Sequence, residues 1–164
     1  QVELSRHAAE EGEGELAFRL LGNAHEDVMT ALETYLRTTF LFLCKRRLAD
    51  RELNVLTARA RNGNPFQSIS RARELFARLS LDPFKVLSDQ ELAFLDRLIQ
   101  KRHVIGHNLG LADEKYLRST GDGVEGQNVR LLGDEVVRFA KASFQVVVEG
   151  IEEVATEFLP PPPN

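Results

Sequence analysis

The chain has few of the features that tie a protein to a membrane, to the cell exterior or to redox chemistry. Its 164 residues include one cysteine, Cys44, which cannot form a disulfide within the chain and has the apolar neighbours of a small buried hydrophobe. No run of about eighteen apolar residues could span a bilayer, and the given residues contain no charged start followed by an apolar core that would mark a signal peptide. The first residue is Gln1. We therefore expect a soluble, cytoplasmic protein cut from a longer chain.

Strand patterns and internal repeats are also scarce, whereas apolar residues recur at steps of three and four along most of the chain. This spacing predicts helices over residues 24–48, 50–61, 66–79, 88–109 and 134–159, with a frayed helix within residues 1–22. We expect an all-α fold, an up-and-down bundle of four to five helices in one domain over residues 1–159. Residues 160–164 are expected to form a proline-rich tail or linker.

The net charge of −4 is unevenly distributed. Residues 1–44 carry 3 Lys/Arg and 8 Asp/Glu, residues 45–102 carry 13 and 7, and residues 103–164 carry 5 and 10. The basic middle could follow a phosphate backbone. On charge alone, the favoured alternative is a set of solvated helix faces that balance acidic neighbours.

The densest chemistry lies between Gln100 and Tyr116, at the end of the helix that the capping box Ser88-Asp-Gln-Glu91 begins. At about 100° per residue, Arg102 falls in the middle of the apolar arc of this helix. A guanidinium there is costly unless it binds an anion or opens onto a cleft. His107 points about 140° away in a regular helix. The two side chains would meet only at an irregular helix end or across a subunit interface.

Other interpretations of these residues remain open. His103 and His107, four apart, share a face and could bind a metal, with Asp113 or Glu114 as third ligand, although the glutamate of a zinc-protease motif is absent. Alternatively, Arg102 is a structural arginine and His107 a helix-end histidine. His7 and His25 lie elsewhere and are expected to be ordinary surface or cap residues.

Arg102-His-Val-Ile-Gly-His107, followed by Asn108, resembles the signature of the HEPN family. That signature is an arginine, four residues and a histidine near the end of a late helix in a small helical bundle. Gln100-Lys101 before the motif, and Gly110, Asp113 and Tyr116 after it, are also similar to the family. The resemblance covers residues from about 24 to 158.

The resemblance implies a metal-independent endoribonuclease that works as a homodimer without a cofactor. His107 would transfer protons, Arg102 would bind the phosphate and Asn108 would orient either group. The helix residues Arg97, Lys101 and His103 would attract the RNA backbone, with Asp113 and Tyr116 in support. The expected products are a 2′,3′-cyclic phosphate and a 5′-hydroxyl. A defence, toxin or stress-response setting would follow.

The chain also departs from parts of the family. Some toxin members carry a tyrosine two residues after the histidine, which a partner enzyme modifies, and Leu109 stands there. That regulation is not expected, but an antitoxin of another kind or an additional domain remains a possible partner. Other members have lost catalysis, so the alternative function is a noncatalytic dimerisation or nucleotide-binding module of a larger protein. A helical scaffold with a purely structural Arg102 is the third interpretation.

Overall fold

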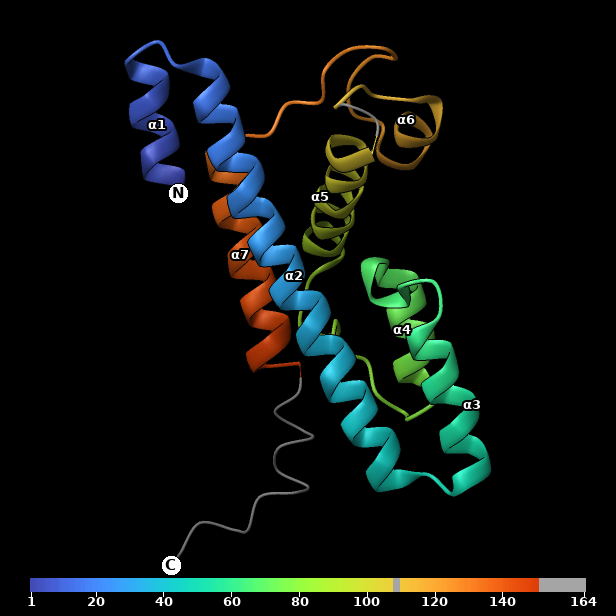
Figure 1. Ribbon diagram of the computed structural model, residues 1–164. Helices are drawn as coiled ribbons and strands as arrows, with labels where there is room; N and C mark the ends of the chain where they lie inside the picture. Colours follow the sequence, from blue (N-terminus) through green and yellow to red (C-terminus); the bar gives the residue numbers. More distant parts are fainter. Residues whose placement is uncertain (108–109, 151–164) are drawn as a thin grey trace, which may run out of the picture. The chain divides into compact units, whose positions relative to one another are not determined.

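A computed structural model describes residues 1–107 and 110–150, with the backbone alone at His107, and every regular element in these residues is a helix. The helices are α1 (Val2–Glu10), α2 (Gly14–Arg47), α3 (Asp50–Arg61), α4 (Ile69–Ala77), α5 (Asp89–His107), α6 (Glu114–Thr120) and α7 (Gly133–Val148), with a 3-10 turn, η1 (Pro65–Gln67) (Figure 1). The predicted all-α class is confirmed. The described residues form seven α-helices rather than the four or five expected. None of these helices is long and apolar enough to cross a membrane.

The chain divides into two compact units. The first contains Gln1–Thr30 and Ala93–Lys141, and the second contains Ala31–Leu92 and the segment that begins at Ala142. The boundaries fall inside α2, α5 and α7. The expected single domain over residues 1–159 stays a prediction, and the expected tail at residues 160–164 lies outside the described residues.

The N-terminal segment is two helices and not one frayed helix. Gly12 has φ 83°, a left-handed conformation that glycine adopts without a steric cost, and it separates α1 from α2. The two helices lie side by side in the first unit, where the Ser5 hydroxyl donates to the Ala17 carbonyl at 2.9 Å (Figure 1). Helix α2 begins at Gly14, ten residues before the expected start at residue 24. A glycine at the first position of a helix does not interrupt it.

The rest of the first unit packs around α5. Phe94, Leu95 and Leu98 of α5 are buried, as are Val136 and Phe139 of α7. A second small cluster of buried residues joins the C-terminal part of α5 to the segment that follows it, and its members are Val104, Ala112, Tyr116 and Val129. In that segment Leu111 and Asn128 form an isolated antiparallel bridge.

The second unit confirms several local predictions. Helix α3 spans Asp50–Arg61 as predicted, and the turn that follows it contains Asn64 in the left-handed region at φ 44°. The Ser88 amide donates to the Glu91 carboxylate at 3.0 Å and the Glu91 amide donates to Ser88 Oγ at 3.3 Å, so the predicted capping box begins α5. Cys44 has no exposed surface. Burial raises the pKa of its thiol to about 11, as expected of an inert core cysteine.

Phenylalanine side chains form the centre of the second unit. The rings of Phe40, Phe66 and Phe76, from α2, η1 and α4, have centroids 5.4 to 6.4 Å apart in tilted and edge-to-face pairs. The helix predicted over residues 66–79 is therefore shorter, because Phe66 belongs to η1 and α4 begins at Ile69. Helix α7 begins at Gly133, next to the predicted residue 134, and the predicted end at residue 159 lies outside the described residues.

Candidate functional site on helix α5

Arg102 binds an acidic residue of its own chain. Its Nε donates to Glu26 Oε2 at 2.8 Å and its Nη2 donates to Glu26 Oε1 at 2.9 Å, a two-pronged ion pair between α5 and α2 within the first unit. The Arg102 side chain is 21% exposed and that of Glu26 is 48% exposed. A guanidinium in the apolar arc was expected to need an anion, and Glu26 provides one. The pair is open enough for solvent or a ligand to reach Glu26.

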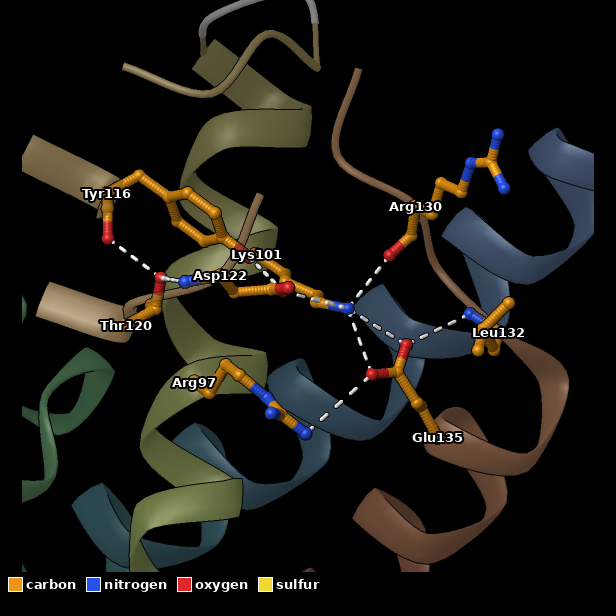
Figure 2. A network of polar contacts seen from close by, with 8 residues as sticks. All are labelled: Arg97, Lys101, Tyr116, Thr120, Asp122, Arg130, Leu132 and Glu135. Atoms are coloured by element: carbon orange, nitrogen blue, oxygen red, sulfur yellow. Dashed lines mark hydrogen bonds and ion pairs between the residues drawn. The ribbon is translucent and has the colours of Figure 1, made fainter. Parts of the chain in front are cut away.

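Lys101, the residue before Arg102, is buried at 4% exposure. Its ammonium lies 2.9 Å from both carboxylate oxygens of Glu135 and donates to the Arg130 carbonyl at 2.8 Å (Figure 2). Asp122 Oδ2 lies 3.5 Å away. Lys101 was expected to attract an RNA backbone, but these partners keep its charge inside the first unit. It joins α5 to the start of α7 and to the preceding loop.

Tyr116 continues this network on the side of α6. Its hydroxyl donates to Asp122 Oδ2 at 2.8 Å, and burial together with this carboxylate raises the pKa of the phenol (Figure 2). Burial alone would raise the pKa of Asp122, yet the hydrogen bond from Tyr116 and the charge of Lys101 bring it below its ordinary value. Tyr116 is 2% exposed. It therefore supports the loop from inside and does not face a ligand.

Asp113 caps α6. Its Oδ1 accepts a hydrogen bond from the Tyr116 amide at 2.7 Å, which satisfies a backbone donor in the first turn of this short helix. Both residues that were expected to support the site thus hold the segment after α5 in place. Through these contacts, Asp113 and Tyr116 fix the position of the end of α5.

Arg97 and His103 are the two other candidates on α5, and both are half-buried. The Arg97 side chain is 38% exposed, its guanidinium lies 5.5 Å from the centre of the Phe94 ring and its Nη2 is 3.9 Å from Glu135. The predicted attraction of RNA by Arg97 and His103 stays a prediction.

His25 is buried, so the interpretation of this histidine as an ordinary surface or cap residue is wrong. It is 2% exposed, its ring meets that of Phe139 edge-on with centroids 5.0 Å apart, and its Nε2 has no hydrogen-bond partner in the described part of the chain. Burial lowers its pKa to about 4, and the charges of Lys101 and Arg102 act in the same direction. The imidazole is neutral at pH 7.

The remaining part of the predicted site lies outside the described residues. This applies to the side chain of His107 and to Asn108 and Leu109, so a meeting of His107 with Arg102 stays a prediction. The backbone shows that α5 ends at His107. The Gly110 amide then donates to the Val104 carbonyl at 3.1 Å, with Gly110 at φ 79°. Helix α5 is therefore described up to the last residue of the motif, and the end of the helix expected over residues 88–109 lies outside the described residues.

The described side chains contain no group of three His, Cys, Asp or Glu residues arranged to hold a metal ion. Comparisons of the chain with models of protein families, with curated proteins and with solved structures found no match. The HEPN resemblance therefore rests on the motif from Arg102 to His107 and on its place at the end of a helix in an all-α chain.

Three acidic residues of the site were not among the sequence candidates. Glu26 binds Arg102, while Glu135 and Asp122 surround Lys101. Part of this was foreseeable, because a guanidinium in an apolar arc requires an anion. The position of Lys101 also gave a signal, since at about 100° per residue it falls next to the edge of the same arc, near Phe94.

Proposed function

We propose that the protein is a metal-independent endoribonuclease of the HEPN type, active as a homodimer. The observation that carries the proposal is the arginine of the motif, which sits on α5 one and a half turns before the helix ends at His107 and is organised for a two-oxygen anion. A phosphate presents the same pair of oxygens as the Glu26 carboxylate. RNA would exchange with Glu26, which is half-exposed.

The reaction needs two proton transfers and one cation. A base removes the proton from the 2′-hydroxyl, the 2′-oxygen attacks phosphorus to form a 2′,3′-cyclic phosphate, and the bond to the 5′-oxygen breaks as an acid protonates it. His107 of the two copies would act as base and acid, with Asn108 orienting it. Arg102 would stabilise the added negative charge on the phosphate. A defence, toxin or stress-response setting suits a nuclease that acts on cellular RNA.

The need for two histidines is what favours a dimer. Gly106 supports it, because this residue is exposed on α5 and, apart from its chain neighbours and the adjacent backbone of its own helix, no described atom lies within 4 Å of the position that a Cβ would take. A helix of a second copy could therefore approach closely between Arg102 and His107. An antitoxin or an additional domain would be a further partner.

The decisive experiment combines RNA cleavage with substitution of the motif. We expect the purified chain in EDTA to cut a labelled RNA and to leave 2′,3′-cyclic phosphate ends, and to leave a 2′-O-methyl strand of the same sequence intact. His107→Ala should lower the rate by at least about a hundredfold, since general acid–base catalysis contributes on the order of 10² to 10⁴. His7→Ala is the matched control, because His7 is exposed on α1.

Sedimentation must establish which samples are dimeric. A dimeric wild-type chain that cuts no faster than His107→Ala would eliminate the catalytic proposal. Cleavage that EDTA abolishes would eliminate metal independence and return attention to the histidine pair at residues 103 and 107.

A noncatalytic dimerisation or nucleotide-binding module is the second candidate. The observation in its favour is that Glu26 already balances the charge of Arg102, so the motif arginine has a structural role without RNA. This candidate predicts that the chain is dimeric and binds ATP in calorimetry while RNA stays intact. Loss of the dimer or of ATP binding in Arg102→Ala would support it further.

A further inference from the structure

A basic groove lies between α3 and α4 in the second unit. It has a volume of about 470 Å³, and three arginines line it: Arg59 from α3, and Arg71 and Arg78 from the segment of α4 and its C-cap. Leu75, which is buried, contributes to the apolar part of the wall. The groove belongs to the second unit alone and shares no residue with the site on α5.

Two other arginines of the second unit form ion pairs with carboxylates. Arg37 is bonded to Glu33, and Arg73 to Asp82. Arg59, Arg71 and Arg78 are exposed, and no carboxylate within the described residues forms an ion pair with them.

The sequence around the groove explains why these arginines have no ion pair among the described residues. The segment from Leu53 to Arg73 contains four arginines and no Asp or Glu. Glu74 is the single acidic residue among those that line the groove. Three guanidinium groups along one concave surface repel each other, so the local potential is positive and an anion with several charges would bind there.

The open form of the groove favours a chain of phosphates over a single one. The arginines come from two helices and lie along a groove that is open to solvent, whereas a site for one small anion would enclose it with converging donors. Arginine also binds phosphate through two parallel hydrogen bonds. A single nucleic-acid strand fits an open groove of this kind, because its backbone presents one phosphate after another.

We propose that Arg59, Arg71 and Arg78 form a binding surface for the phosphate backbone of single-stranded RNA. The choice of RNA as the polyanion rests on the proposed function, whereas the binding of phosphates by the groove does not depend on cleavage. The surface would hold the strand through charge without reading its sequence. It would account for the basic middle of an otherwise acidic chain.

The test measures binding separately from cleavage. The wild-type full chain is titrated into a fluorescent single-stranded RNA of about twenty nucleotides with 2′-O-methyl groups, which cannot be cut through its 2′-oxygen, at several salt concentrations. For a single strand, the logarithm of the binding constant falls with the logarithm of the salt concentration with a slope of about −0.7 per phosphate contact. The triple variant R59Q/R71Q/R78Q removes three such contacts and should therefore reduce the magnitude of this slope by about 2. Its affinity should fall at least about tenfold in low salt.

Two further variants separate this surface from net charge and from misfolding. The control R19Q/K115Q/R118Q removes three exposed cations of the first unit and should change affinity by less than about threefold. R59K/R71K/R78K keeps the charges and should keep most of the slope, since lysine binds phosphate as a point charge. Far-ultraviolet circular dichroism establishes that each variant is folded.

Equal losses in the control and in the groove variant would overturn the proposal, as would an unchanged salt slope in R59Q/R71Q/R78Q. Tighter binding of a polyglutamate peptide than of RNA would also overturn it, and would assign the groove to an acidic protein. If the wild-type chain binds RNA through the groove but does not cut unmodified RNA, the result would support the groove proposal and contradict the nuclease proposal. The two proposals can therefore fail separately.

Discussion

The buried ammonium of Lys101 provides the sharpest test of which cations on α5 are structural. We expect Lys101→Met to destabilise the protein, because methionine has a similar length but leaves the Glu135 carboxylate without its main partner. The Arg130 carbonyl would lose a donor as well. RNA binding, measured where the variant is folded, should not change.

The magnitude follows from burial. Removing one member of a buried ion pair costs about 3 to 5 kcal/mol. The Glu135 side chain is 14% exposed and also accepts from the Leu132 amide at 3.1 Å, so some of its hydrogen bonding would remain. We therefore expect a loss of about 3 kcal/mol in the free energy of unfolding. In a chain of this size this lowers Tm by roughly 6 to 12 °C.

The assay is urea denaturation followed by circular dichroism, with a second variant as control. K101M/E135Q removes both charges and keeps an acceptor for the Leu132 amide, so it should regain about 1 to 2 kcal/mol relative to Lys101→Met alone. A Lys101→Met protein within about 0.5 kcal/mol of the wild type, with weaker RNA binding, would refute the structural role. It would restore Lys101 to the set that contacts RNA.

Two other predictions concern His25 and Glu26. The pKa of His25 is about 4 in the folded protein and 6.5 in the unfolded chain. Between pH 4 and pH 6.5, therefore, the imidazole is protonated in the unfolded chain but not in the folded protein. The contribution of His25 to the free energy of unfolding is complete above pH 6.5 and is lower by about 2 kcal/mol at pH 5. His25→Leu should remove that loss, as urea titrations at pH 7 and pH 5 would show, and an equal loss in both proteins would contradict it. Glu26→Gln should cost at most about 1 kcal/mol, because the pair is partly exposed, and should strengthen RNA binding in the same fluorescence assay.

Local features of the fold were predictable from the sequence. The bounds of α3, the turn that contains Asn64 and the capping box at Ser88 all depend on residues within a few positions of one another. The start of α2 was not predicted, because the residues of α1 and of the first turns of α2 were assigned to one helix. A single frayed helix was expected within residues 1–22, whereas Gly12 separates α1 from α2 and Gly14 is the first residue of α2.

Partners distant in the chain were not predictable in the same way. His25 was interpreted from its own neighbours, but it is buried because Phe139 of α7 packs against its ring. Lys101 is buried because Glu135, in the first turn of α7, lies nearby and the Arg130 carbonyl faces it. Helical periodicity assigns a residue to a face of its helix, but it does not identify which residue of another helix lies opposite.

Arg102 shows that the motif alone does not establish a role in phosphate binding. Its partner Glu26 is 76 residues away in the chain, and that ion pair is enough to explain an arginine in an apolar arc. The position of Arg102 therefore does not by itself require a phosphate. The two roles differ in the effect of Glu26→Gln on RNA binding. If Arg102 is only structural, losing Glu26 loosens α5 and leaves RNA affinity unchanged; if it binds phosphate, losing the competing carboxylate raises the affinity. A stronger interaction that disappears again in E26Q/R102Q would assign it to Arg102.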